Sequence, residues 1–502
     1  MTIEDVRRAL RSDEPLVVVE APAGCGKTYE AIGAAVDLAK GIAPHQEVLL
    51  LAHTNAAVQV FRQRARAQLA RVHASTLDAF AFGLIGSYAA VLNLPAPLHP
   101  GQQPGDTPFT TLAPKLCELF QRAPSIARAV AGHYPVLILD EHQDSRVDQY
   151  RAVEILASTG RCRVRVFGDP MQAIYGFEKG ELVDWAGVCG KATSMHTLRE
   201  PHRWHDAAKL GEWIVSARTQ LRNGGLLPLT TAPAEVKVCR IADLGSLDNP
   251  NSSQVVQALA RPLQEVLAAA TGTIAVLART NAHVLGLRRT VRRRLAIDEG
   301  ADLPDAYRFV SHARECAGKP KDLALLVVDI LSATCAGMDR AKKLQITKRL
   351  HDDDMHTRRA GAILPFLTSL QPIYDHPDLV TWCTVVGAVG RHPPEGVKVD
   401  CPAIFRILGT LKPTEGEDPR DRLDALLRYR RDVGSAPPRC VSTIHKAKGR
   451  EFDHVVIVPC SGKSFNDTPD ARQVLYVALS RAKQSITLIV PRENPSPLLH
   501  FG

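Results

Sequence analysis

The residues best suited to chemistry form a run of small side chains that ends in lysine and threonine. Ala21-Pro-Ala-Gly-Cys-Gly-Lys-Thr28 follows an apolar run and opens a helical pattern. It matches the phosphate-binding pattern G-x-x-x-x-G-K-[ST], except that Ala21 replaces the first glycine. Small residues let backbone amides approach a phosphate, and a helix N-terminus attracts the anion. A glycine-rich strand–helix turn with an incidental lysine is the alternative.

Lys27 and Thr28 of this run, together with two later carboxylates, are expected to carry out the chemistry. In the run itself, Lys27 would reach the β- and γ-phosphates and Thr28 would ligate Mg²⁺. Asp140 and Glu141 end the apolar run Val136–Leu139, where Asp140 would also hold Mg²⁺ and Glu141 is the candidate base for the attacking water. An acidic loop at a strand end is the alternative. The residues of the run expected to bind nucleotide are Ala23, Gly24, Cys25, Gly26, Lys27 and Thr28.

The elements that must position these residues are short runs of Val, Ile and Leu that alternate with helical patterns. Leu16–Glu20, Val48–Ala52 and His454–Val458 are examples from both ends of the chain. Continuous apolar strands that alternate with helices indicate parallel sheets covered on both faces. Two stretches interrupt this rhythm and are interpreted as insertions into α/β cores, one Pro/Gly/Gln-rich in part and one mostly helical in pattern.

Several segments in a fixed order resemble a known family. Asp140-Glu-His-Gln-Asp144 has the motif II form of superfamily 1 helicases of the UvrD/Rep/PcrA kind. Thr443–Phe452 and Val474–Ala482 are similar to motifs V and VI. The other similar segments are Leu51–Ala57, Thr76–Phe80, Gly168–Phe177, Leu198–Arg203 and Ala275–Asn281. The resemblance implies an α/β fold of two RecA-like P-loop NTPase cores with parallel sheets, each carrying a reduced, mostly helical insertion.

The motif positions also set the expected domain boundaries. The expected domains are a first core at 1–84 and 131–200 with an insertion at 85–130, and a second core at 201–305 and 437–502 with a helical insertion at 306–436. The spacing between the motifs makes both insertions short, the first most clearly. Some 20 residues follow the last motif, so no nuclease domain is expected there.

Catalytic roles follow from the resemblance where this sequence matches a motif. Gln143 and Gln172 occupy positions that sense the γ-phosphate in the family. Arg203 and Arg481 would reach that phosphate from the second core and stabilise transition-state charge, so hydrolysis would depend on closure of the cores. A surface ion pair is the alternative for either arginine. The implied catalytic residues are Glu141, Gln172, Arg203 and Arg481.

The base and ribose of the nucleotide are expected to meet His202 and Glu451. Glu451 resembles the motif V residue that contacts the ribose, and His202 stands where the family usually has a base-stacking tyrosine. The first 45 residues contain no glutamine, so the family's adenine-reading motif is missing. We expect ATP and Mg²⁺ as cofactors, and these departures from the family leave the strictness of the ATP preference open.

A track for single-stranded DNA is implied beside the nucleotide site. Tyr175 and Phe177 fall where the family places aromatic residues against bases, and such stacking is worth about 1–3 kcal/mol per base. The implied DNA-binding residues are Thr54, Asn55, Phe80, Tyr175, Phe177 and His445. Core packing is the alternative for Phe80 and Phe177, and an interior histidine is the alternative for His445.

Composition and charge bound the class of protein. The chain has 502 residues, of which 45% are hydrophobic and 23% charged, as in ordinary globular proteins. Its formal charge of +9 is compatible with a polyanionic partner but does not require one. The 11 cysteines form no C-x-x-C pair and no zinc-ligand spacing with histidine. No membrane span or secretory signal is evident, and a cytoplasmic location is expected.

These observations predict an ATP-dependent DNA helicase or translocase that moves 3′→5′ on single-stranded DNA. Its expected partners are single-stranded DNA, duplex junctions and, in the alternative, a separate nuclease subunit. That alternative is a DNA-sensing ATPase component, as in phage defence, which regulates the nuclease without processive unwinding. A P-loop kinase is disfavoured because it would not need the segments similar to other helicase motifs, namely Leu51–Ala57, Gly168–Phe177, Thr443–Phe452 and Val474–Ala482.

Overall fold

The computed structural model describes most of the chain, and every statement below refers to those parts. The described residues are 2–53, 57–58, 61, 71–94, 111–175, 181–242, 253–280, 283–284, 287, 295–297, 303–352, 363–399, 402–411, 422–423 and 438–501.

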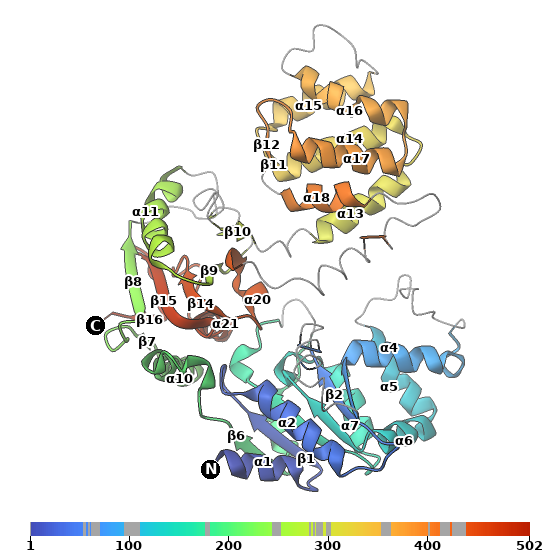
Figure 1. Cartoon of the computed structure of the whole chain (residues 1–502), viewed down its shortest axis with the longest axis vertical. Coiled ribbons are helices and arrows are strands. Elements are labelled where there is room, and N and C mark those ends of the chain that lie inside the picture. The colour runs from blue at the N-terminus through green and yellow to red at the C-terminus, as the bar shows by residue number, and fades with distance from the viewer. Residues whose placement is uncertain are drawn as a thin grey trace. The chain divides into compact units, whose positions relative to one another are not determined.

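A six-stranded parallel sheet forms the centre of the first core (Figure 1). Its order is β3-β2-β4-β5-β1-β6, and every pair of neighbours runs parallel. The strands are β1 (Leu16–Glu20), β2 (Val48–Ala52), β3 (Val72–Thr76), β4 (Val136–Leu139), β5 (Arg163–Gly168) and β6 (Ser194–Thr197). Because non-consecutive strands are neighbours, the connections between them must cross over the sheet, and helices cover both of its faces.

The alternation of side chains along a strand explains why both faces are apolar. In β2, Leu49 and Leu51 belong to the hydrophobic cluster on one face, while Val48 and Leu50 belong to the cluster on the other. Successive side chains of a strand point to opposite faces, so a strand buried on both sides must be apolar throughout. The uninterrupted Val and Leu run is therefore the sequence signal of a central strand.

Different helices cover the two faces of the first sheet. The helices α1 (Ile3–Arg11) and α2 (Lys27–Lys40) contribute to the cluster that contains Val48 and Leu50. The helices that contribute to the opposite cluster are α4 (Leu77–Ser87), α5 (Leu112–Arg122), α6 (Pro124–His133) and α7 (Val147–Ala157). Over its described residues, the stretch 85–130 thus packs against the first sheet as part of its covering layer.

A second six-stranded sheet forms the centre of the second core, in the order β10-β13-β9-β14-β15-β8. Its strands are β8 (Val236–Ile241), β9 (Ile274–Ala278), β10 (Ala296–Ile297), β13 (Arg439–Thr443), β14 (Phe452–Ile457) and β15 (Ala482–Pro491). The pairings of β13 with β9, β9 with β14, β14 with β15 and β15 with β8 are all parallel. The helices that accompany it are α10 (Ala208–Arg222), α11 (Ser253–Ala269), α20 (Ile444–Ala447) and α21 (Pro469–Leu479). The predicted α/β class with two parallel sheets is confirmed.

The order of the first sheet brings distant segments to one edge. β4, β5, β1 and β6 are successive neighbours, and they all point the same way. The residues that follow their carboxyl ends therefore line up side by side. Ligands of open parallel sheets bind at this edge, outside the carboxyl ends of the strands.

The chain divides into two compact units, one formed by residues 1–296 with 438–502 and the other by residues 297–437. The second unit is helical, apart from the short antiparallel pair β11 (Cys335–Ala336) and β12 (Lys398–Val399). Its helices are α13 (Leu303–Glu315), α14 (Pro320–Thr334), α15 (Arg340–His351), α16 (Leu364–Asp375), α17 (Leu379–Arg391) and α18 (Pro402–Thr410).

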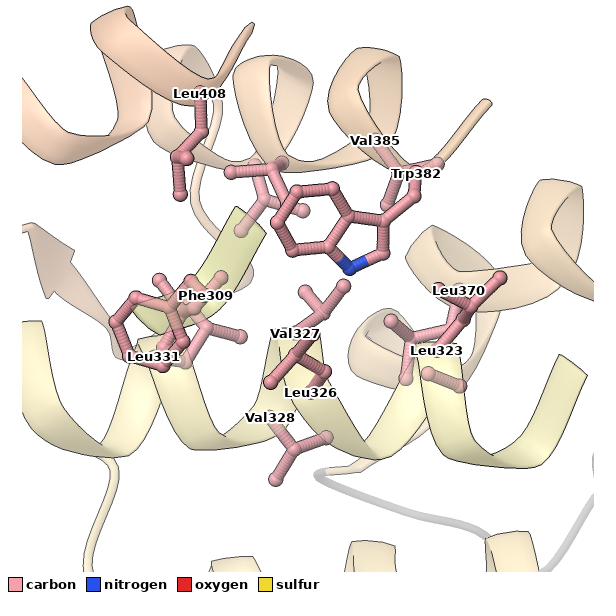
Figure 2. Packing of buried hydrophobic residues seen from close by; sticks show 14 of the residues in the cluster. Phe309, Leu323, Leu326, Val327, Val328, Leu331, Leu370, Trp382, Val385 and Leu408 are labelled. Atoms are coloured by element: carbon pink, nitrogen blue, oxygen red, sulfur yellow. The ribbon is translucent and has the colours of Figure 1, made fainter. Parts of the chain in front are cut away.

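The helical unit has a hydrophobic core of its own. Trp382 of α17 lies among Val327 of α14, Leu408 of α18 and other apolar side chains (Figure 2). The Trp382 side chain is 1% exposed, and its indole Nε1 has no hydrogen-bond partner among the described residues. The apolar surface of the ring, rather than its N–H, must therefore provide the stabilisation.

We expect Trp382→Ala to lower the free energy of unfolding of the helical unit by about 3–5 kcal/mol, because it leaves a large cavity. Trp382→Phe should cost much less, since it keeps an aromatic ring and removes a buried N–H that lacks a partner. Urea unfolding followed by circular dichroism measures both. Equal losses for the two variants would contradict a stabilising role of the ring alone.

None of the helices in the described segments is long and apolar enough to cross a membrane. The ten cysteines described are all free thiols.

Candidate active site

The loop after β1 has the backbone geometry of a phosphate-binding loop. Gly24 has φ +75° and Gly26 has φ +81°, a region that glycine adopts without strain. At Gly24, a Cβ atom would also lie 2.8 Å from the Cβ of Arg203. Glycine is therefore required at this position both by conformation and by the close approach of a second segment.

Lys27 begins α2 and points back over the loop. Its Nζ donates to the carbonyl of Ala21 at 3.1 Å and lies 3.5 Å from Oε1 of Glu141. The side chain is buried, so its charge acts in a medium of low dielectric constant. Together with the positive end of α2, it makes the loop attractive to an anion.

Thr28 and Asp140 meet at the place where a divalent cation is expected. The Thr28 hydroxyl donates to Oδ2 of Asp140 at 3.3 Å. The other oxygen, Oδ1, is buried and has no hydrogen-bond partner in the described part of the chain. Burial and the neighbouring Glu141 charge raise the pKa of Asp140 above its usual range. A hard cation would satisfy this orphaned oxygen, so the residues present fit Mg²⁺.

Glu141 stands at a sharp turn of the backbone. Its φ of +52° is rare for a residue other than glycine, and the turn opens the short helix η3 (His142–Asp144). Burial alone would raise the pKa of Glu141, but Lys27, Lys448 and the Gln143 amide hold it below its usual range. An ionised carboxylate at this turn can accept a hydrogen bond from a water molecule at neutral pH.

The two predicted glutamines lie on adjacent strand ends. Gln143 donates through Nε2 to Glu141 Oε2 at 2.5 Å and accepts through Oε1 from the backbone N–H of Asp169 at 2.9 Å. Gln172 lies in the short helix η4 (Pro170–Gln172), which follows β5. Its Nε2 donates to Asp169 at 2.9 Å, and its Oε1 accepts from Arg481 Nη2 at 3.3 Å. One chain of hydrogen bonds thus connects Glu141 to Arg481.

Arg481 is buried between the cores. Its Nε donates to the carbonyl of Val477 at 3.0 Å and its Nη1 donates to that of Arg450 at 3.2 Å. Burial, together with the nearby Arg203 charge, lowers the pKa of Arg481 to about 10, so it remains a cation at neutral pH. A rigidly held cation of this kind is suited to stabilising negative charge that develops beside it.

Arg203 reaches the same region from the short helix η5 (His202–Trp204). Its guanidinium donates to the Ser480 carbonyl and to Glu451 Oε1, both at 2.6 Å. The Nε of Arg203 is buried and has no partner within the described segments, so it is a free donor. The ion pair with Glu451 places these two predicted residues side by side.

The backbone of η5 is bonded directly to the phosphate-binding loop. The N–H groups of His202 and Arg203 donate to the carbonyl of Gly24 at 2.9 and 3.2 Å. The His202 ring is exposed, with its Cδ2 3.3 Å from the position of a Cβ on Gly26. The structure thus brings His202 to the loop, and its contact with a base stays a prediction.

Other residues of the site were not predicted, and Asp169 is the most connected of them. It is fully buried, follows β5, and accepts from Arg218 Nη2 at 2.7 Å. Arg218 of α10 also donates to Glu20 at 2.6 Å. Tyr476 of α21 contacts both the loop and Asp169. Asp169 and Tyr476 lie inside motifs that were recognised, whereas no sequence signal marked Arg218 or Glu20.

Lys448 was also missed, although it lies within motif V. Its Nζ contacts both carboxylate oxygens of Asp144, at 2.7 and 2.5 Å, and the carbonyl of Gln172. It also lies 4.8 Å from the centre of the Tyr175 ring. This lysine therefore contacts residues that follow β4 and β5 and also a residue of the predicted DNA track.

Part of the predicted DNA track comes together. The Tyr175 hydroxyl donates to the carbonyl of His445 at 2.9 Å, and the two ring centres are 6.2 Å apart. The His53 ring is stacked toward Tyr175 at 6.5 Å. Tyr175 is partly buried, and its contact with a base stays a prediction.

Phe80 takes the alternative role considered for it. Its side chain is 7% exposed and belongs to the apolar cluster of the first sheet, where its ring meets the edges of His73 and Tyr134. A ring packed in this way offers no free face for base stacking. Thr54, Asn55 and Phe177 lie outside the described residues, so their predicted roles stay predictions.

Two segments match helicase families at the level of sequence. Residues 102–183 match the UvrD/REP helicase N-terminal domain, and residues 438–489 match the UvrD-like helicase C-terminal domain. The first segment contains motif II, Asp140–Asp144, and the second contains the segments similar to motifs V and VI. The resemblance to UvrD-like superfamily 1 helicases is therefore confirmed in both cores.

Curated relatives match over short stretches. A component of an ATP-dependent helicase/nuclease from Streptococcus equi subsp. zooepidemicus is 40% identical over 73 residues, which are 14% of this chain and 6% of that protein. The RecB component of the RecBCD enzyme of Mycobacterium tuberculosis is 31% identical over 119 residues, 24% of this chain and 10% of that protein. The alignments thus cover at most about a tenth of these two relatives. Among solved structures, the Pif1 helicase of Candida albicans aligns with a TM-score of 0.32 and 16% identity, over 59% of this chain and 55% of that one.

Proposed function

We propose that this chain is an ATP-dependent helicase or translocase that moves 3′→5′ along single-stranded DNA. The observation that supports the proposal is a cluster of charged and polar side chains around the loop after β1, to which both predicted cores contribute. The first core provides the phosphate-binding loop with Asp140 and Glu141, and the second provides Arg481. A site shared in this way links hydrolysis to the relative position of the cores, which is what a translocating motor requires.

In the proposed reaction, each residue has a separate task. Lys27 and the loop amides hold the phosphates, and Glu141 orients and polarises the attacking water. Arg481 and Arg203 stabilise charge on the phosphoryl group in the transition state. Mg²⁺ held by Thr28 and Asp140 would neutralise phosphate charge when bound.

The DNA side of the proposal is supported by the cluster around Tyr175. An aromatic face beside Lys448 and His445 offers stacking for a base, with positive charge nearby. Lys448 contacts Asp144 and Gln172 of the nucleotide-side strand ends. DNA bound at this cluster would therefore change the positions of residues next to the proposed site of hydrolysis.

A second candidate function is a DNA-sensing ATPase that regulates a separate nuclease. The names of the relatives favour it, since one belongs to a helicase/nuclease and the other to the RecBCD enzyme. In that case the nucleotide site would serve as a DNA-dependent switch, without processive strand separation.

Tailed duplexes separate the two candidates. We expect DNA-stimulated ATPase activity, together with ATP-dependent strand separation on a duplex with a 3′ single-stranded tail and none on the matched 5′-tailed duplex. ATPase stimulated by single strands without strand separation, even at high protein concentration, would reject the helicase and favour the sensor. Unwinding of only the 5′-tailed duplex would reject the proposed polarity. Lys27→Ala serves as the inactive control.

A further inference from the structure

One side-chain hydroxyl of the second core accepts a hydrogen bond from the phosphate-binding loop, in addition to the backbone bonds that η5 makes to Gly24. Tyr476 of α21 is 1% exposed, and its Oη accepts from the backbone N–H of Ala23 at 2.9 Å. The same Oη donates to Oδ2 of Asp169 at 3.3 Å. Because the hydroxyl accepts on one side and donates on the other, its orientation is determined by both partners.

Asp169 is itself held rigidly. Two guanidinium nitrogens of Arg218 donate to its Oδ1, Nε at 3.0 Å and Nη2 at 2.7 Å. Its Oδ2 accepts from Gln172 at 2.9 Å as well as from Tyr476. Arg218 also pairs with Glu20 at 2.6 Å, and all three charged side chains are buried. Moving the carboxylate would break a buried ion pair, which is costly.

We propose that Tyr476 is a positioning residue that fixes the phosphate-binding loop in its nucleotide-binding shape, with Asp169 and Arg218 as its anchor. The proposal rests on nucleotide binding at the loop, as proposed above. Ala23 is buried, so without the hydroxyl its amide would lose the partner that the described residues provide. The loop would then have to rearrange before or during nucleotide binding, and affinity would fall.

The neighbouring Arg481 has a different task, although it comes from the same helix end. Arg481 contacts the Gln172 side chain, and within the described residues none of its hydrogen bonds is to the loop. Tyr476 contacts the loop backbone and is not placed to touch developing charge. Tyr476, in α21, is therefore expected to strengthen nucleotide binding in the ground state. Arg481, two residues after the end of α21, is expected to stabilise the transition state. The two contributions are separable in kinetics.

The test is Tyr476→Phe, which removes only the hydroxyl. We expect the Kd for a fluorescent, non-hydrolysed ATP analogue and the KM for ATP to rise about tenfold or more. The kcat at saturating ATP should stay within about twofold, because Arg218 and Gln172 still hold Asp169. The matched control is Tyr374→Phe in the helical unit, which loses a 3.5 Å contact to the Leu350 carbonyl and should leave both constants unchanged.

Arg218→Lys provides an independent variant, because it keeps the charge but cannot donate twice to Asp169. It should raise Kd in the same direction, and a thermal melt of each variant establishes that the folded protein is being measured. A wild-type Kd in both folded variants would overturn the proposal, as would a loss of kcat at unchanged Kd. If the wild type and Lys27→Ala bind the analogue equally, nucleotide binding at the loop is wrong instead.

Discussion

Glu141→Gln should lower the DNA-stimulated kcat for ATP hydrolysis by about 10²–10⁴-fold while nucleotide binding is retained. Glutamine keeps the shape of the side chain, and the left-handed turn at this position does not depend on the charge. What is lost is the carboxylate, held ionised by Lys27 and Lys448, that can polarise a water molecule. Single-turnover hydrolysis and binding of a fluorescent nucleotide measure the two effects separately.

The matched control for this variant is Glu154→Gln. Glu154 lies on α7 and pairs with Lys191, so the same chemical change is made in a surface ion pair. Exposed pairs of this kind contribute little, and activity should be unchanged. Retained DNA-dependent hydrolysis in Glu141→Gln would show that the base is wrongly assigned.

Arg481→Ala should have an effect of similar or greater size, a loss of about 10³–10⁵-fold in kcat if the arginine acts as a finger. Nucleotide affinity should change much less, since the hydrogen bonds of Arg481 to described residues do not include the phosphate-binding loop. The guanidinium is held by backbone carbonyls and by Gln172, so its charge is placed before the reaction begins. Steady-state kinetics with a parallel binding titration give the ratio of the two losses.

Arg261→Ala is the control for this second variant. Arg261 lies on α11 of the second core, is largely exposed, and pairs only with Glu265 within the described residues. The substitution removes a guanidinium from the same core at a position outside the candidate site. Equal losses of kcat and of affinity in Arg481→Ala would argue against transition-state stabilisation, since a finger acts only as charge develops.

The central strands could be predicted because burial on both faces leaves no room for polar residues. Leu16–Glu20 and Val48–Ala52 have the predicted bounds as β1 and β2. The edge strands β6 (Ser194–Thr197) and β8 (Val236–Ile241) were missed, because polar residues interrupt both of them and leave no continuous apolar run. Edge strands are stabilised by pairing with a neighbour, and a short sequence window does not contain that neighbour.

The site could be predicted to the extent that its residues follow strand ends. Asp140 and Glu141 come directly after β4, Lys27 and Thr28 follow the loop after β1, and local sequence marks all four. Arg218 could not be found in this way, since it lies in the middle of α10 and reads as an ordinary helical arginine. Its role depends on partners almost 50 and 200 residues away, Asp169 and Glu20.

The helical unit is connected along the chain to two strands of the second sheet. The strands on either side of that unit, β10 and β13, are neighbours in the sheet, and neighbouring strands lie about 4.8 Å apart. A segment whose two ends are so close can be lengthened, exchanged or replaced by a short turn without disturbing the strands that carry it. The helical unit, residues 297–437, is attached to the second sheet in this way, so a change in its length need not move either of the two strands.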